Sequence, residues 1–376
     1  MGFTCREEIA FYSLSTRQQL ITMHNSMSPQ INRRDFLKIS GLALASLAFN
    51  LFPPYSDEYN QPTTPLGRIT RDISVFRAPT WPDGDTVAYL HRDDIVNLYY
   101  ELTPVSGPPY NPVWYRVWNG YIHSAYVQKV RINLNTPVDQ LPETGQLCEV
   151  TVPYTQIYQY STYTGWSQRA RLYYRSTHWA VGVDEGPDRA PWYRLWDELS
   201  REQYHVPANA IRLISDAEIS PLSPEVPPEQ KRLEVSLANQ TLTAYENDQV
   251  VLFKKISSGL NQRPDPNDIG WHTPPGIYHI QSKYPSKHMG AGDLAGDGSD
   301  LPGVPWTCFF LSPPGYAFHG AYWHNNFGLQ MSHGCINMDI QDALWLFRWT
   351  TPIFPTPIES RADWYRTGYG TLVNST

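Results

Sequence analysis

The sequence has few charged side chains and few cysteines for its length. Only 17% of its 376 residues are Asp, Glu, Lys or Arg, and the net charge is -7 at pH 7. A mildly acidic chain lacks the basic surface that nucleic-acid binding requires, so we expect no nucleic-acid partner. Four cysteines are too few for a disulfide scaffold, and their positions lack the CxxC spacing of a zinc site. At least one thiol should be free, and a Cys148–Cys308 disulfide stays open as an alternative.

Long apolar runs are also missing. The run from Ile39 to Phe52 has about 14 residues, whereas a membrane-spanning helix needs about 20. It follows the segment Asn32-Arg33-Arg34-Asp35-Phe36-Leu37-Lys38. An arginine pair before a modest apolar run resembles a twin-arginine export signal. The alternative is a buried helix preceded by an arginine pair that arose by chance.

This resemblance implies a leader over residues 1–52, with the signal at 27–52 and Met27 as a candidate start. It further implies export by the twin-arginine translocase to an extracytoplasmic location in the cell envelope. A signal that is not cleaved would leave the protein anchored to the membrane. Residues 53–67 are rich in Pro and Asn without periodicity, which predicts a linker.

Aromatic and turn-forming residues are abundant. The chain has 25 Tyr, 13 Trp, 33 Pro and 24 Gly, which favours short strands joined by turns and predicts a mainly β fold. Between the linkers 53–67 and 220–230, the sequence repeats itself. Leu98-Tyr99-Tyr100 precedes Trp114-Tyr115-Arg116-Val117-Trp118, and Leu172-Tyr173-Tyr174 precedes Trp192-Tyr193-Arg194-Leu195-Trp196. The repeat predicts two copies of one small unit, at 68–135 and 136–219.

The first copy resembles bacterial SH3-type domains over Trp114 to Val130, where a Trp-Tyr strand, a Gly turn and a closing Tyr-Val segment occur in order. The resemblance implies two small SH3-like β-barrels. The second copy departs from it, because residues 197–208 replace the turn and the following strand with a polar insert. The aromatic faces are candidates for binding cell-wall peptide or glycan. We favour the alternative that these Trp and Tyr side chains form the cores of spacer units.

From residue 231 onward the pattern is again rich in strands. Alternating segments at 232–237, 240–245 and 249–256 predict an antiparallel meander. Thr273-Pro274-Pro275-Gly276 predicts a rigid turn into a further strand. A Gly- and Asp-rich loop is expected at 285–303, and long loops in compact domains are often lids. One helix is predicted from Asp339 to Trp349.

The residues with reactive side chains lie just before that helix. His319, His324 and His333 precede Cys335 within the segment Ser332-His333-Gly334-Cys335-Ile336-Asn337. A cysteine is a strong nucleophile as a thiolate, so it needs a base or a positive field. Glycine before the cysteine lets main-chain N–H groups face a developing oxyanion. A helix that began directly after Cys335 would lower the thiol pKa through its N-terminus.

The pattern H-x(12)-S-H-G-C-I-N is similar to the signature of the YkuD-type L,D-transpeptidases, and the resemblance covers 231–376. It implies a YkuD-type β-sandwich domain with a short helix after the catalytic cysteine. It implies Cys335 as the nucleophile, His319 as its base and the Gly320 carbonyl as the group that orients the imidazole. The Gly334 and Cys335 N–H groups would bind the oxyanion, and His333 would shape the turn.

The same resemblance suggests which residues contact the substrate. Ser332 and Asn337 would support the turn, although many relatives carry Arg where Asn337 stands. Met289 and Tyr284 fall where relatives carry a flap, and packing within the flap is their alternative role. Trp323 and His324 would line the acceptor side or simply pack.

The implied reaction is acyl transfer through a Cys thioester, from a peptidoglycan tetrapeptide stem to an amine, without cofactor or metal. The alternatives are an L,D-carboxypeptidase on the same fold and a wall-binding protein without activity. A zinc site at His319, His324, His333 and Cys335 has no matching spacing. A papain-like NlpC/P60 peptidase requires a histidine after the cysteine, and no histidine follows His333.

Overall fold

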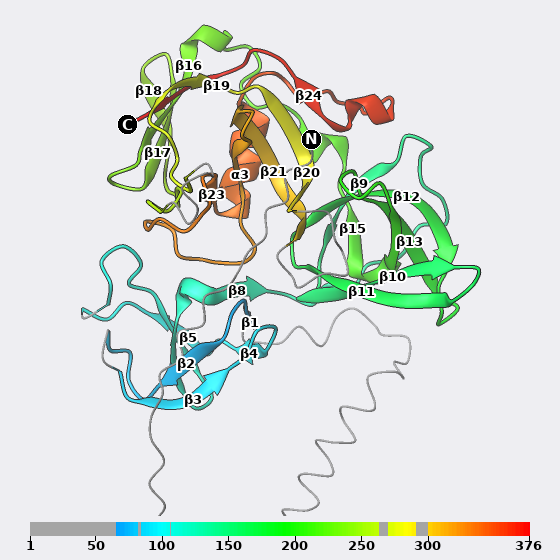
Figure 1. The fold of residues 1–376 in the computed structure, drawn as a ribbon, viewed down its shortest axis with the longest axis horizontal. Coiled ribbons are helices and arrows are strands. Elements are labelled where there is room, and N and C mark those ends of the chain that lie inside the picture. The colour runs from blue at the N-terminus through cyan, green and yellow to red at the C-terminus, as the bar shows by residue number, and fades with distance from the viewer. Residues whose placement is uncertain (1–64, 82–83, 106, 263–269, 291–299) are drawn as a thin grey trace, which may run out of the picture. The chain divides into compact units, whose positions relative to one another are not determined.

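The computed structural model describes residues 65–81, 84–105, 107–262, 270–290 and 300–376. The predicted leader and its arginine pair lie outside these residues. The described chain is mainly β, as predicted, and forms five sheets and short helices (Figure 1). None of the described helices is long and apolar enough to cross a membrane.

Residues 66–130, here named the first β unit, form two sheets with the strand orders β4-β1-β8 and β3-β2-β7-β6-β5. The predicted linker at 53–67 extends too far, because β1 already begins at Leu66. The elements are β1 (Leu66–Ile69), β2 (Ile73–Phe76), β3 (Thr86–Leu90), β4 (Ile95–Asn97), β5 (Tyr100–Leu102), β6 (Trp114–Val117), β7 (Gly120–His123), the 3-10 helix η2 (Ser124–Tyr126) and β8 (Val127–Val130).

Residues 146–213, the second β unit, form one sheet with the order β11-β10-β14-β13-β12-β9-β15. Its elements are β9 (Gln146–Val150), β10 (Tyr154–Ser161), β11 (Gly165–Tyr173), β12 (Thr177–Glu185), β13 (Pro191–Trp196), β14 (Gln203–Pro207), η3 (Ala208–Ala210) and β15 (Ile211–Leu213). The short helices α2 (Asp216–Ile219) and η4 (Pro228–Gln230) follow.

The two units have the same strand order. The long strand β12 takes the place of both β5 and β4, and every other strand has one counterpart in the other unit. The predicted polar insert at 197–208 is therefore wrong in part, because β14 lies within it and pairs with β13. The polar residues only lengthen the connection before that strand.

One part of the predicted repeat pairs the wrong segments. Residues 172–174 end β11, the counterpart of β3, whereas residues 98–100 follow β4. The equivalent positions are instead two turns with left-handed backbone, at Asp93 with φ 72° and Arg175 with φ 66°. The Trp-Tyr-Arg segments do correspond, since both lie on the central hairpin of their unit.

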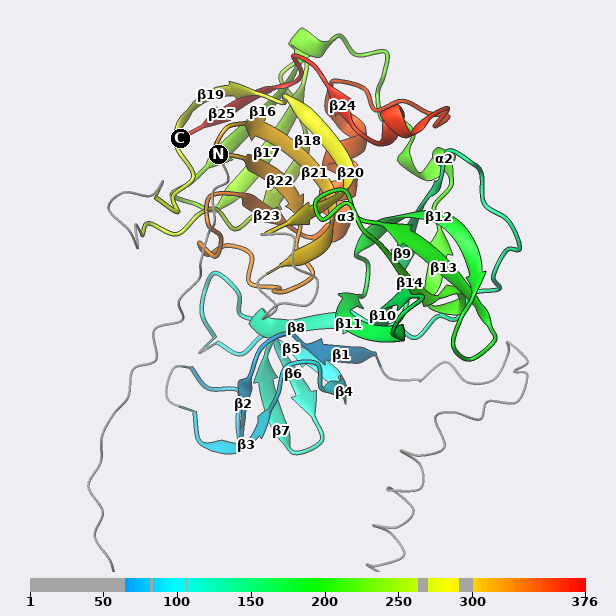
Figure 2. The ribbon, with the colours of Figure 1, turned by 45° about the vertical axis from the view of Figure 1, so that its right-hand side comes forward.

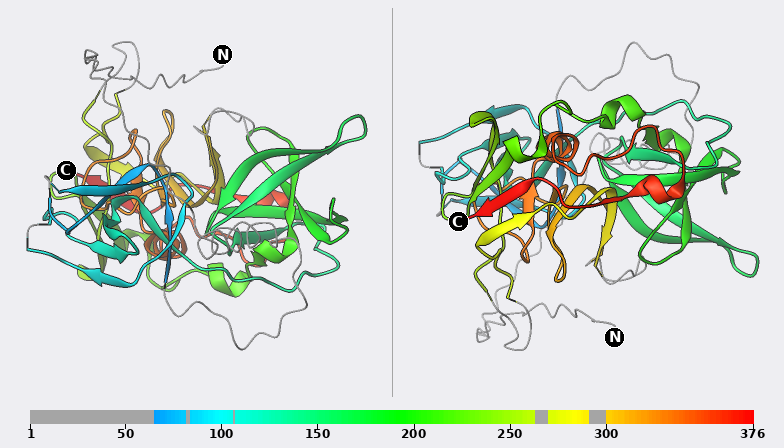
Figure 3. Two further views of the ribbon diagram at one scale, coloured as in Figure 1. Left: turned by 90° about the horizontal axis from the view of Figure 1, so that it is seen from below. Right: turned by 90° about the horizontal axis from the view of Figure 1, so that it is seen from above.

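Residues 231–375, the C-terminal region, form two five-stranded sheets with the orders β18-β17-β16-β25-β19 and β23-β22-β21-β20-β24. The C-terminal strand lies between β16 and β19 (Figure 3). The elements are β16 (Lys231–Ser236), β17 (Thr241–Glu246), β18 (Gln249–Lys255), β19 (Gly276–His279), β20 (Ser282–Met289), β21 (Leu301–Leu311), β22 (Tyr316–Gly320), β23 (Ile336–Met338), α3 (Ile340–Trp349), η5 (Arg361–Trp364), β24 (Arg366–Thr367) and β25 (Leu372–Ser375).

The predicted helix is present as α3, and it begins after its N-cap Asp339, whose carboxylate accepts a hydrogen bond from the Gln341 main chain. Its buried residues, among them Ala343 and Phe347, pack on the β20–β23 sheet (Figure 2). The same apolar core includes Leu147 and Trp179 of the second β unit. That unit is therefore packed directly against the C-terminal region.

The predicted loop at 285–303 is strand at both of its ends. Strands β20 and β21 pair as an antiparallel hairpin, and only the residues between Met289 and Leu301 connect them. The Gly and Asp content misled the prediction, because it is concentrated in this connection while the flanking residues alternate between buried and half-buried positions. Cys148 and Cys308 are buried free thiols and form no disulfide.

Candidate active site

Cys335 lies directly before β23, which pairs in parallel with β22. The register places Asn337 beside His319, and it continues one step to place Cys335 beside Ala317. Side chains two residues apart on a strand share a face of the sheet. Cys335 and His319 are therefore diagonal neighbours on one face, and the small Ala317 side chain leaves space between them.

The His319 imidazole is buried, and its Nδ1 lies 3.2 Å from the carbonyl oxygen of Gly320. Because a carbonyl can only accept, Nδ1 carries the proton and Nε2 is left with its lone pair. Burial lowers the pKa of His319 to about 4, although the Gly320 carbonyl favours the protonated form. The ring is therefore neutral at pH 7 and can accept a proton.

The Cys335 thiol is half-buried, with its sulfur 3.7 Å from the Gly315 carbonyl oxygen. Burial raises the pKa of Cys335 to about 11, and a hydrogen bond with the Ala317 main chain only partly opposes this rise. The predicted helix dipole at the thiol is wrong, because a strand follows Cys335 and α3 begins at Ile340. The resting pair is thus a neutral thiol beside a neutral imidazole.

The turn before Cys335 is closed by Ser332. Its hydroxyl donates to the Cys335 carbonyl and accepts from the Gly334 N–H at 3.1 Å. The Gly334 N–H is therefore already engaged in this structure, contrary to its predicted role as an oxyanion donor. The Cys335 N–H remains the main-chain candidate for that role.

Gly334 has φ +120°, in the region of the backbone map that favours glycine. A Cβ atom there would lie 2.2 Å from the Tyr316 ring. Its carbonyl accepts a hydrogen bond from the Thr273 hydroxyl at 2.8 Å, and that hydroxyl also accepts from the Gly259 N–H. The sequence analysis predicted the turn at Thr273 but missed its contact with the cysteine turn, since 61 residues separate the two partners.

His333 is exposed, and its ring packs against Trp271 with the centroids 3.9 Å apart. His324 is buried, and its Nε2 lies 2.8 Å from the Asn337 side-chain amide. His324 Nδ1 accepts from the Asn326 N–H at 3.2 Å, so Nδ1 carries no proton. Burial, reinforced by nearby His319, lowers the pKa of His324 to about 3.

Trp323 contacts the imidazole of His319, with the ring centroids 5.5 Å apart. The predicted flap residues lie elsewhere on the hairpin. Tyr284 stacks on Tyr365 with the centroids 5.3 Å apart, and Met289 pairs with Leu301 near the hairpin connection. Among the described residues, no group of His, Cys, Asp and Glu side chains is arranged to hold a metal ion.

The first β unit contacts the segment Tyr322–Asn326, which follows β22. The buried Arg68 guanidinium donates to the Tyr322 carbonyl at 2.8 Å and pairs with Asp93 at 3.0 Å. The Asn111 amide donates to the Asn325 carbonyl at 3.0 Å. The sequence analysis missed Arg68 and Asn111, because contacts across more than 200 positions leave no local pattern.

Residues 230–373 match the YkuD family model, described as the L,D-transpeptidase catalytic domain. Among curated proteins, no relative matches the chain significantly. Solved structures that it resembles include the Enterococcus faecium L,D-transpeptidase C442S mutant, at 21% identity over 39% of this chain and 50% of that chain, with TM-score 0.27.

Two further structures resemble the chain. An L,D-transpeptidase from Xylanimonas cellulosilytica has 21% identity over 39% of this chain and 60% of that chain, with TM-score 0.25. One from Mycobacterium smegmatis has 19% identity over 39% and 58%, with TM-score 0.29. The chain thus spans between half and three fifths of these three structures. The family that the cysteine motif predicted is the family whose model residues 230–373 match, the YkuD-type L,D-transpeptidase catalytic domains.

Proposed function

We propose that this protein is a cysteine-dependent L,D-transpeptidase that acts on peptidoglycan stem peptides outside the cytoplasm. The observation that carries the proposal is the His319 imidazole, whose Nδ1 is held by the Gly320 carbonyl at 3.2 Å. That contact leaves Nε2 as a base on the face of the sheet that also bears Cys335. The match of residues 230–373 to the family supports the same reaction class.

In the first step, the Cys335 sulfur attacks the carbonyl carbon between the L-centre of the stem's diamino acid and its terminal D-residue. A C–S bond forms, the C–N bond breaks, and the thiol proton passes through His319 to the leaving amine. Because both groups start neutral, proton transfer accompanies the attack. The Cys335 N–H is the candidate donor to the developing oxyanion, a contribution typically worth about 10²–10³-fold.

In the second step, the amine of an acceptor stem attacks the thioester. A C–N bond forms, the C–S bond breaks, and the amine proton returns through His319 to the sulfur. The product is a cross-link between two diamino acids. Water in place of the amine would give an L,D-carboxypeptidase, and the ratio of cross-linked dimer to free tripeptide measures this partition. Export of the chain by the twin-arginine route belongs to the same proposal.

The test is intact-protein mass after incubation of the full chain with a carbapenem. Wild type should gain one adduct, and Cys335→Ala should gain none, because the acylated sulfur is gone. Cys308→Ala is a matched control, since it removes a free thiol that is fully buried in the core, and it should still be labelled. A folded wild-type protein that gains no adduct would overturn the proposal.

A further inference from the structure

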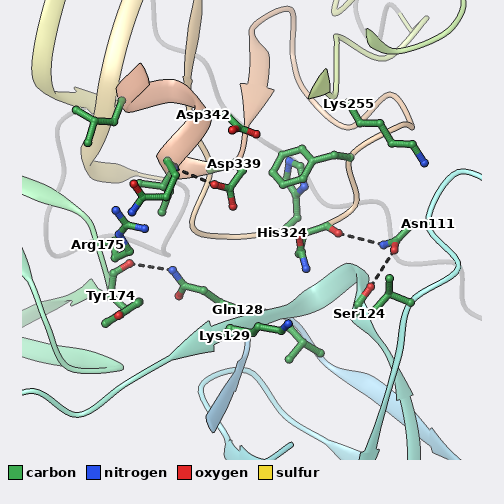
Figure 4. Close-up of a pocket in the computed structure, with 18 of the residues that line it drawn as sticks. Asn111, Ser124, Gln128, Lys129, Tyr174, Arg175, Lys255, His324, Asp339 and Asp342 are labelled. Atoms are coloured by element: carbon green, nitrogen blue, oxygen red, sulfur yellow. Dashed lines mark hydrogen bonds between the residues drawn. The ribbon is translucent and has the colours of Figure 1, made fainter. Parts of the chain in front are cut away.

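A large polar cavity is walled by all three regions of the described chain and is lined by His324, which follows the His319 strand (Figure 4). Its volume is about 930 Å³, near the upper end of the range for small-ligand sites. The first β unit contributes Lys129, the second contributes Arg175, and the C-terminal region contributes His324 and the start of α3. The cavity is therefore large enough for a peptide of several residues.

Hydrogen bonds between the regions hold these walls in place. The Asn325 N–H donates to the Ala125 carbonyl at 2.7 Å, and the Lys255 ammonium donates to the Tyr110 carbonyl at 2.6 Å. On the opposite wall, the Gln341 amide oxygen accepts from the Arg175 guanidinium. These contacts join both β units to the C-terminal region around the cavity, which makes it a defined site.

The cavity presents charges of both signs. Lys129 lies on one wall, and Asp339 and Asp342 lie on the opposite one (Figure 4). Lys129 pairs with Glu101 at 2.7 Å, and Arg212 pairs with Glu149 at 2.6 Å. Such a lining does not suit an apolar ligand, which would leave these groups desolvated, or a polyanion, which the carboxylates would repel. It suits a ligand that carries both carboxylates and an amine.

The cavity is connected to the candidate catalytic pair through His324. This side chain lines the cavity and is bonded to Asn337, which lies beside His319 in the sheet register. Trp323, the residue before it, contacts the His319 ring. A ligand in the cavity therefore lies along the segment that leads to the base.

We propose that this cavity binds the acceptor, a zwitterionic stem peptide that brings the attacking amine together with its own carboxylates. The inference rests on the proposed function and deepens it by assigning the second substrate to a site that both β units help to build. The bound acceptor supplies its amine to the thioester carbon, where the C–N bond replaces the C–S bond and the proton leaves to His319. The β units are then part of the acceptor site rather than spacers.

The experiment measures cross-linked product by mass spectrometry with a tetrapeptide donor and a tripeptide acceptor that ends in the diamino acid. The tripeptide has no terminal D-residue to release, so it acts only as acceptor. Lys129→Glu and Arg131→Glu each reverse one charge on the cavity wall. We expect each to raise the acceptor KM about tenfold, with little change in the donor KM.

Arg77→Glu is the control, because it breaks a more exposed ion pair, with Asp85, in the same β unit but away from the cavity. It should leave both KM values unchanged. An acceptor KM that is unchanged in both cavity variants would overturn the acceptor site while leaving the proposed function intact. Failure of the wild type to release the terminal D-amino acid or to be acylated would instead refute the function itself, and the inference with it.

Discussion

The two β units have the same strand order but hold different parts of the C-terminal region. The first unit holds the segment beside His319 through buried polar groups, with Arg68 donating to the Tyr322 carbonyl at 2.8 Å. The second unit holds the β20–β21 hairpin, where the Thr177 hydroxyl donates to the Pro285 carbonyl at 2.7 Å. It also stacks Trp179 on Trp364 with the centroids 4.5 Å apart.

The contact between the second β unit and the β20–β21 hairpin, here named the second contact, is tightly packed and contains two buried histidines. The contact between the first β unit and Tyr322–Asn326 is named the first contact. His288 is buried with its Nδ1 2.7 Å from Asp197, and a Cβ atom at Gly303 would lie 2.2 Å from His178. The first contact holds no buried histidine–carboxylate pair among the described residues. A shared strand order therefore leaves the docking chemistry of each copy free to differ, and the side chains at the interface decide what each copy holds.

Among the proposed substitutions, Arg68→Met in the first contact should cause the largest loss in the free energy of unfolding. The change removes a cation with 2% exposure and leaves the Tyr322 carbonyl and Asp93 without this partner. Breaking a buried ion pair costs about 3–5 kcal/mol, and Asp93 keeps Arg171 at 2.7 Å, so we expect about 3 kcal/mol in the free energy of unfolding. Urea denaturation measures the loss, and cross-linking turnover should fall because Tyr322–Asn326 is released.

Arg71→Met is the control for this variant. Arg71 is exposed near the same strand and only contacts Tyr126, so the free energy of unfolding should change by less than about 0.5 kcal/mol. Equal effects of the two substitutions would show that the first contact does not depend on the buried guanidinium.

Acid should weaken the second contact before the first. Burial lowers the pKa of His178 to about 3, His288 adds to this effect, and Asp197 opposes it. An unfolded histidine titrates near pH 6.5, so below that pH the unfolded state binds more protons and stability falls by about 1.4 kcal/mol per pH unit. Between pH 6.5 and 4.5 this group alone should cost about 2 kcal/mol.

Denaturant midpoints over that pH range test the effect. In the variant His178→Gln, the free energy of unfolding should fall less steeply as the pH decreases, because Gln does not titrate. Its stability at pH 7 should nevertheless be lower than that of the wild type. Parallel pH profiles for wild type and variant would mean that His178 does not titrate in the unfolding reaction.

The smallest expected effect compares one repeat position in the two units. Trp118 is 78% exposed, whereas its counterpart Trp196 packs against the core of the C-terminal region. Trp196→Ser should cost about 1–3 kcal/mol in unfolding free energy, and Trp118→Ser less than about 0.5 kcal/mol. Thermal denaturation of both variants checks this difference, and equal costs would contradict the inequivalence of the two copies.

Local patterns predicted much of the fold. The alternation in 232–256 gave the meander β16 to β18, and the apolar spacing after Asp339 gave α3. The pattern missed β14, because the polar residues 197–202 directly before it hid the short alternation of Tyr204 and Val206 that pairs with β13. It also misread the hairpin β20–β21, because part of the burial of β20 comes from contact with Thr177 of the second β unit.

For the candidate site, the motif named candidate residues but did not specify their hydrogen bonds. The Gly320 carbonyl oxygen lies 3.2 Å from His319 Nδ1, and its role in orienting the imidazole stays a prediction. The Ser332 hydroxyl, however, takes the Gly334 N–H that was assigned to the oxyanion. Such competition between nearby acceptors depends on side-chain rotamers, which a sequence motif does not specify. Arg68 and Asn111 had no motif at all.

The neutral state of the Cys335 thiol has a consequence for its survival. Peroxide and alkylating reagents react with thiolates, and a thiol with its pKa near 11 is almost entirely protonated at pH 7. The sulfur is therefore protected against oxidation to the sulfenic acid while no substrate is bound. Under the proposed function, the sulfur becomes a nucleophile when an acyl donor reaches it and its proton passes to His319, so a protonated resting thiol is compatible with turnover.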